Sequence, residues 1–129
     1  MSDFSLIKGD LAPLRIYGMM YMASPYSKYH GGIEQAAKEA ALISGRIMQH
    51  GVNVFSPVVY THTIAMVCNI DPFDYDFWMG IDYKFMDLCD ALLVAEMPGW
   101  DISYGIGLEI EYFKKHDKAI FHLETGICR

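Results

Sequence analysis

The chain has 129 residues, which is the size of one domain with a single hydrophobic core. Hydrophobic residues make up 53% of the sequence and charged residues 20%, a composition that excludes a disordered chain. The net charge of -6, with 10 basic against 16 acidic residues, excludes a surface built to neutralise a nucleic-acid polymer.

The three cysteines, Cys68, Cys89 and Cys128, are widely spaced, so they indicate neither a disulfide framework nor a paired-cysteine metal site. The five histidines show no metal-ligand spacing, although His62 follows a predicted strand end on the expected ligand side. No segment approaches the roughly 18 continuous apolar residues of a membrane span, and the N-terminus lacks a signal-peptide pattern. We therefore expect a cytoplasmic protein that uses no membrane, no metal ion and no cofactor.

The first half of the chain alternates between strand and helix patterns. Residues 1–14 read as an irregular leader, and the nearly continuous apolar run 16–23 predicts a strand buried on both faces. A polar loop follows over residues 24–32. Apolar residues then recur at spacings of three and four over 33–50, which predicts an amphipathic helix. Residues 52–56 predict a second buried strand, closed by a proline.

The second half continues the alternation. The expected elements are a short helix near 63–68, a helix over 73–88, a strand over 91–96, a loop over 97–103, a helix over 104–116 and a strand over 119–123. Strands that alternate with helices predict right-handed crossovers and a parallel sheet. The predicted fold is a single α/β domain over residues 15–129. It is Rossmann-like (flavodoxin-like), with four to five parallel strands and helices on both faces.

In such sheets, ligands bind beyond the carboxyl ends of the strands. We therefore expect the site among residues 23–32, residues 56–62, the turn after Glu96 and the start of the helix at Tyr104.

The segment 99–109 carries the strongest signal for a functional site. It follows a buried strand and opens a helix, so its backbone N–H groups are able to face an anion. Gly105 and Gly107 allow a ligand or a neighbouring backbone to approach closely. Glu109 lies about one helical turn further on, on the glycine side, whereas Glu111 is expected to face solvent.

Two aspartates form a second group of candidates. Asp82 lies within a predicted helix beside Trp78, Ile81 and Phe85, and an acid among large apolar residues tends to have a raised pKa, as a general acid requires. Asp90 directly precedes a predicted strand, and it is either a site residue or an ordinary turn residue.

Tyr21 ends the first buried run, and Ser24, Pro25 and Tyr26 follow it. These residues supply hydroxyl groups and backbone N–H groups at a predicted strand end. The segment is either a simple turn or a small binding loop.

Four short motifs occur in order: residues 21–26 (Tyr-Met-Ala-Ser-Pro-Tyr), Phe77-Trp78 with Asp82, Cys89-Asp90, and residues 103–109 (Ser-x-Gly-x-Gly-x-Glu). In their order and spacing, between residues 16 and 123, the chain resembles the nucleoside 2-deoxyribosyltransferases and the related deoxynucleoside 5′-monophosphate N-glycosidases. It resembles most a phage- and bacteria-associated branch of that superfamily.

The resemblance implies roles for the matching positions. Glu109 is expected to be the nucleophile and Tyr21 the phenol that holds its carboxylate, while Asp82 and Asp90 serve the leaving base and the hydrogen-bond frame. Ser103 is expected to bind a phosphate, which favours a nucleotide over a nucleoside. The expected substrate-binding residues are Ser24, Pro25, Tyr26, Trp78, Ser103, Gly105 and Gly107. The loop after the first strand lacks the arginine of the monophosphate enzymes and has Lys28 instead.

The resulting hypothesis is a hydrolase that cleaves the N-glycosidic bond of a (deoxy)nucleoside 5′-monophosphate through a covalent glycosyl-enzyme on Glu109. The alternatives are a deoxyribosyltransferase that exchanges bases and a non-catalytic sensor of a nucleotide-derived ligand. The family also implies a homodimer or a higher homo-oligomer. The aromatic, Met-rich stretch 60–86 either supplies that interface or packs in the core.

Overall fold

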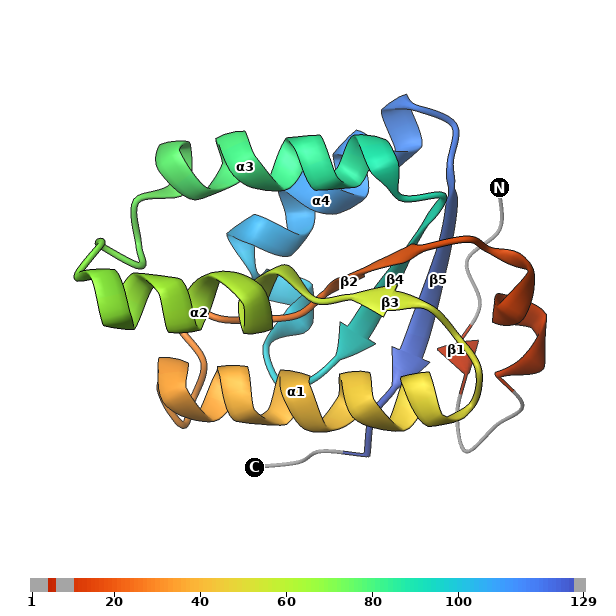
Figure 1. Cartoon of the computed structure of the whole chain (residues 1–129), viewed down its shortest axis with the longest axis horizontal. Coiled ribbons are helices and arrows are strands. Elements are labelled where there is room, and N and C mark those ends of the chain that lie inside the picture. The colour runs from red at the N-terminus through yellow and green to blue at the C-terminus, as the bar shows by residue number, and fades with distance from the viewer. Residues whose placement is uncertain (1–4, 7–10, 127–129) are drawn as a thin grey trace.

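The computed structural model describes residues 5–6 and 11–126 (Figure 1). Its strands are β1 (Ser5–Leu6), β2 (Met20–Ala23), β3 (Val54–Phe55), β4 (Ala91–Glu96) and β5 (Ala119–Glu124). Its α-helices are α1 (Ile33–Gln49), α2 (Pro57–Cys68), α3 (Tyr75–Leu88) and α4 (Tyr104–Lys115), and its 3-10 helices are η1 (Ala12–Ile16) and η2 (Trp100–Ile102).

The strands form one sheet in the order β1-β5-β4-β2-β3, and every neighbouring pair is parallel. The central register pairs Met20 with Ala91 and Ala23 with Val94. Apart from β1, this is the flavodoxin-like order, in which the chain reverses its winding direction between β2 and β4. The predicted α/β class and parallel sheet are confirmed.

Helices cover both faces of the sheet (Figure 1). Helix α1 packs on one face, where Ala36, Ala40, Ile43 and Ile47 join Met20 and Met22 in one buried cluster. Helices α3 and α4 pack on the other face, where their buried residues meet Tyr21 and Leu92. Alternate residues of β2 therefore enter opposite layers, as the pleat of a strand requires.

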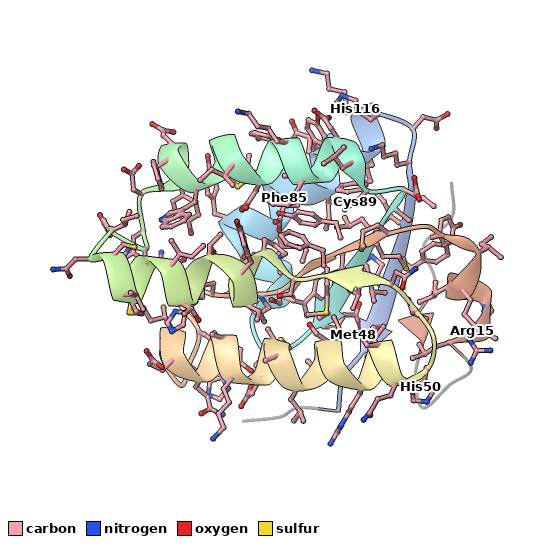
Figure 2. All side chains as sticks on the ribbon, in the orientation of Figure 1. Arg15, Met48, His50, Phe85, Cys89 and His116 are labelled. Atoms are coloured by element: carbon pink, nitrogen blue, oxygen red, sulfur yellow. The ribbon has the colours of Figure 1, made fainter. Side chains whose placement is uncertain are left out.

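Residues 11–23 differ from the expected leader and long strand. Ala12–Ile16 form η1, with a proline in its first turn, so β2 begins only at Met20. Figure 2 shows Arg15 lying beside His50 at the end of α1, where the Arg15 Nε donates to the His50 carbonyl oxygen at 2.6 Å. The two residues of β1 also lie in the expected leader, and they pair with β5.

Helix α2 is longer than predicted. The expected helix near 63–68 begins at Pro57, where Ser56 caps it by accepting from Val59 N–H at 3.2 Å. A proline at the first helical position loses no hydrogen bond, because that N–H has no intrahelical partner. The proline that ends β3 therefore also begins α2. No helix in the described part of the chain is long and apolar enough to cross a membrane.

Candidate active site

A cleft opens beyond the carboxyl ends of β2 and β3, at the end of the sheet where an open α/β fold binds ligands. The β2–α1 loop, the start of α2, helix α3 and the start of α4 all contribute to its walls. Its empty space, including the open mouth, is about 590 Å³. Three of the four expected segments line it, and Pro98 and Gly99 after Glu96 line a second cleft beside it.

Glu109 and Tyr21 meet at the buried side of this cleft. The Tyr21 hydroxyl donates to Oε2 of Glu109 across 2.5 Å, although the two residues are 88 positions apart in the chain. Tyr21 is fully buried, and Glu109 is 6% exposed. The rings of Phe55 and Phe113 contact the Tyr21 ring, with centroid distances of 6.0 and 5.8 Å, so packing fixes its direction. One carboxylate oxygen is therefore held in place, and the other is left for a ligand.

Asp82 lines the same cleft from α3 and is 8% exposed. Its Oδ1 is buried and has no hydrogen-bond partner, and the same is true of Ser24 Oγ on the β2–α1 loop. Buried polar atoms without partners are rare in folded proteins, because each costs free energy that a ligand or water would recover. The cleft thus presents two polar groups that a ligand could satisfy.

Burial raises the pKa of both carboxyl groups. The pKa of Asp82 rises to about 7 because its charged form is desolvated. The pKa of Glu109 rises to about 8, chiefly through burial and further through the Asp82 charge, while the Tyr21 hydrogen bond acts in the opposite direction. The two acids therefore influence each other and exchange protons near neutral pH, as an acid–nucleophile pair requires.

The other predicted binding residues fall into two groups. Ser24, Tyr26, Trp78, Ser103 and Gly105 line the cleft with the two acids. Ser103 caps α4 by accepting from Ile106 N–H at 3.3 Å, which puts the helix N-terminus at the cleft. Trp78 donates its indole N–H to the Asp71 carbonyl oxygen at 2.8 Å, so its ring is a fixed wall.

Three predicted residues lie elsewhere. Asp90 is at the amino-terminal end of β4, the end of the sheet away from the cleft, where its Oδ2 accepts from Gly18 N–H at 2.9 Å and Met19 N–H at 3.3 Å. The structure thus places Asp90 away from the cleft in the position of a turn residue, and a catalytic role for it stays an untested prediction. Gly107 is exposed on α4 and does not line the cleft, and Pro25 lines only the second cleft.

Sequence reasoning missed Tyr75 and Ser27. Their hydroxyl oxygens lie 2.6 Å apart, which links α3 to the β2–α1 loop where the two clefts adjoin. Lys28 and His30 line the second cleft, whose ionisable side chains include no carboxylate. The polar loop over 24–32 was the available signal, but a contact to Tyr75, 48 positions away, cannot be read from local pattern.

The arrangement places an oriented carboxyl group with a pKa of about 8 in the same partly desolvated cleft as a second acid with a pKa of about 7. Such a pair is suited to stabilising a developing cation and to donating a proton to a leaving group. Among residues 5–6 and 11–126, no group of three or more histidines, cysteines or acids is placed to hold a metal ion.

Comparison with known proteins gives a family and no activity. No curated protein matches the sequence. A family model described as a domain of unknown function (DUF1937) matches residues 18–125, which include β2 to β5, all four α-helices and every residue that lines the cleft. Because this match extends over most of the chain, the protein belongs to the DUF1937 family.

Proposed function

We propose that the chain is an N-glycosidase that hydrolyses a (deoxy)nucleoside 5′-monophosphate, with Glu109 as the nucleophile. The observation that carries this proposal is the buried Glu109 carboxyl group, bonded to Tyr21 and sharing a cleft with the unpartnered Asp82. The motif resemblance to the nucleoside 2-deoxyribosyltransferase superfamily supplies the substrate class. The geometry is consistent with the roles that this resemblance implies for Glu109, Tyr21 and Asp82.

In the first step, an oxygen of the Glu109 carboxylate forms a bond to the anomeric carbon of the sugar as the bond from that carbon to the base nitrogen breaks. The electron pair of the broken bond stays on the base, which takes the proton of Asp82. The pKa values of about 7 for Asp82 and about 8 for Glu109 place a single shared proton mainly on Glu109 in the empty cleft, so the step requires that this proton first move to Asp82. Water then attacks the anomeric carbon, returns a proton to Asp82 and releases the sugar from Glu109.

The phosphate end of the substrate is assigned to the start of α4. Ser103 caps this 12-residue helix and lines both clefts, so the first-turn N–H groups of Tyr104 and Gly105 are available to an anion there. Lys28 lines the second cleft on the opposite loop and adds a positive charge. We assign no fixed phosphate contact to Lys28, because an ammonium group orients a phosphate less strictly than an arginine fork.

The direct test is a screen of nucleotides and nucleosides for release of free base. Glu109→Gln keeps the size of the side chain and removes the nucleophile, so turnover of the active compound should fall about a thousandfold or more. Glu111→Gln is the matched control, because Glu111 is exposed on the same helix. Turnover that survives in Glu109→Gln would end the nucleophile assignment.

The same screen separates the alternative functions. Adding a second free base yields a new nucleoside or nucleotide only if the enzyme transfers the sugar. A sensor would bind one of the compounds without releasing base, and Glu109→Gln would leave that affinity unchanged.

We propose, from the resemblance, that the chain acts in the cytoplasm as a homodimer or a higher homo-oligomer. Several large apolar side chains within residues 60–86 are exposed, among them Tyr60, Met66, Val67, Phe73 and Phe77. Sedimentation of the wild type and of Val67→Lys tests this proposal, and a wild type that stays monomeric across concentrations would contradict it.

A further inference from the structure

A chain of three polar side chains leads away from the cleft at Tyr26. This residue follows β2, and it lines both clefts. Its hydroxyl oxygen lies 2.7 Å from Nδ1 of His62 on α2, and the two rings meet edge to face with centroids 5.6 Å apart. Nε2 of His62 lies 3.1 Å from Oε1 of Glu34 in the first turn of α1. Three separate elements therefore meet in one hydrogen-bonded chain.

When the His62 imidazole is neutral, the chemistry of the three groups sets the direction of both hydrogen bonds. The Glu34 carboxylate only accepts, so Nε2 of His62 must carry a proton. In the neutral imidazole, Nδ1 is then a lone pair, and it accepts the proton of the Tyr26 hydroxyl. Burial and the nearby Glu34 raise the pKa of Tyr26 to about 12, so this hydroxyl keeps its proton. His62 is 7% exposed, so surrounding residues hold its ring in place.

The consequence is that the only proton of the Tyr26 hydroxyl is directed at His62. The lone pairs of the oxygen remain, so a ligand group that reaches Tyr26 must donate to it. If the orientation were reversed, with Nδ1–H donating to the oxygen, Tyr26 would present a donor instead. The Glu34–His62 pair therefore determines which kind of ligand group Tyr26 accepts.

The position of Tyr26 indicates which part of the substrate it meets. In the proposed function, the anomeric carbon lies at Glu109 and the phosphate lies at Ser103. Tyr26, Ser103 and Glu109 all line the first cleft, so a sugar that spans the distance from Glu109 to Ser103 lies in the cleft that Tyr26 also lines. A sugar hydroxyl both donates and accepts, so it can donate to Tyr26, whereas a phosphate oxygen or a carbonyl oxygen, which only accepts, cannot.

We propose that Glu34 and His62 orient the Tyr26 hydroxyl as an acceptor for a sugar hydroxyl of the nucleotide, which makes Tyr26 a specificity-determining residue and His62 its positioning residue. This inference rests on the proposed function for its ligand. Its hydrogen-bond direction, however, is a property of the protein alone and is tested separately.

The hydrogen-bond direction is read from the nitrogen NMR spectrum of His62, assigned by comparison with His62→Leu. The expected spectrum is that of the tautomer with the proton on Nε2 and none on Nδ1. The opposite tautomer would overturn the inference, whatever the protein catalyses. This readout remains valid if no nucleotide releases base, so a failure of the proposed function is distinguishable from a failure of this proposal.

The ligand is tested with the active nucleotide and its analogues that each lack one sugar hydroxyl. In the wild type, one analogue should have a KM about threefold to tenfold higher, the effect of one neutral hydrogen bond. In Tyr26→Phe, the same analogue and its parent should have equal KM values. If every analogue shows the same KM ratio in the wild type and in Tyr26→Phe, no sugar hydroxyl binds Tyr26 and the proposal fails.

A double-mutant cycle identifies the role of His62. If His62 acts through Tyr26, His62→Leu should reduce the hydroxyl discrimination in the wild-type background, because the Tyr26 hydroxyl is then free to rotate, and should change nothing further in Tyr26→Phe. His62→Asn, which places an acceptor near the position of Nδ1, should restore part of the discrimination. Tyr60→Phe is the matched control, because it deletes another phenol from the same helix as His62 but outside both clefts, and it should keep the discrimination. Additive effects of His62→Leu and Tyr26→Phe would contradict the positioning role.

Discussion

At the scale of single residues, the Tyr21–Glu109 pair reconciles two opposing demands on a nucleophilic carboxylate. Burial at 6% exposure strips water from Glu109 and raises its pKa to about 8, which favours the protonated, unreactive form. The Tyr21 hydroxyl donates to Oε2 and stabilises the charged form. The reactive state in our proposal holds one proton on the acid pair, with Asp82 protonated and Glu109 charged. Tyr21 favours this state because it contacts Glu109.

Replacement of Tyr21 by Phe should therefore reduce activity and move its pH dependence. Without the hydroxyl, the pKa of Glu109 rises further, so the acidic limb of the profile of kcat/KM against pH shifts to higher pH. The lost hydrogen bond to a charged group should lower kcat/KM roughly tenfold to a hundredfold. Profiles recorded between pH 5 and 9 check this expectation. Tyr60→Phe is the control, because Tyr60 does not line the cleft. An unshifted acidic limb in Tyr21→Phe would mean that Glu109 does not titrate in that limb.

At the scale of elements, the local sequence pattern predicted a helix or strand correctly where only one physical signal was present. The apolar run of β4 and the helical spacing of α1 predict those elements almost to the residue. The pattern failed at Pro57, where the same residue ends β3 and begins α2, because a proline stops a strand and suits the first turn of a helix equally well.

The site shows the same limit. The glycine-rich approach to Glu109 indicated a helix N-terminus at the ligand end of the sheet, and Asp82 among apolar neighbours indicated a raised pKa. Asp90 also stood beside a strand, but at its amino-terminal end, which faces away from the cleft. The strand direction alone distinguishes the two ends of the sheet. Asp90 was assigned to the site from the motif resemblance and not from its position ahead of the strand. The Ser27–Tyr75 contact depends on tertiary packing and left no local pattern.

The structural role of Asp90 leads to a prediction for the strands that it joins. Its carboxylate accepts from two backbone N–H groups ahead of β2, and a Cβ at Gly18 would lie 2.8 Å from Oδ2. Asp90→Ala should lower the free energy of unfolding by about 0.5–1.5 kcal/mol, because two exposed N–H groups exchange a carboxylate acceptor for water. Gly18→Ala should destabilise the same junction by crowding the carboxylate. Urea unfolding measures both changes.

The rate of base release distinguishes this structural role from a catalytic one. At a temperature where Asp90→Ala is fully folded, its kcat should equal that of the wild type, because Asp90 lies at the opposite end of β4 from the cleft. A loss of kcat at full folding would show that Asp90 takes part in catalysis after all.

At the scale of the whole molecule, the rest of the fold offsets the free-energy cost of burying two acids in the cleft. The reversal between β2 and β4 opens the crevice, and the helices α3 and α4 bring two acids into it from different parts of the chain. Each acid is less costly to bury when it is protonated. The free energy of unfolding should therefore fall as pH rises and the two buried acids ionise. The same burial gives the cleft acids that titrate near neutral pH.

This exchange predicts the effect of Asp82→Asn on thermal unfolding. The Asp82 carboxyl group has its ordinary pKa of 3.8 when the chain is unfolded and a pKa of about 7 in the fold. As pH rises from 4 to 7, the unfolded state therefore loses this proton first, and the free energy of unfolding falls by as much as about 4 kcal/mol.

An amide has no proton to lose, so Asp82→Asn should unfold at a temperature roughly 10 °C higher than the wild type at pH 8. At pH 4, the folded wild type keeps this carboxyl neutral and the unfolded chain has lost the proton in little more than half of its molecules, so less than about 1 kcal/mol of this advantage should remain. Asp76→Asn, an exposed acid on the same helix, should show no such pH-dependent gain. If the Asp82→Asn advantage were the same at pH 4 and pH 8, Asp82 would not carry a raised pKa and would be ionised at neutral pH, unable to protonate a leaving base.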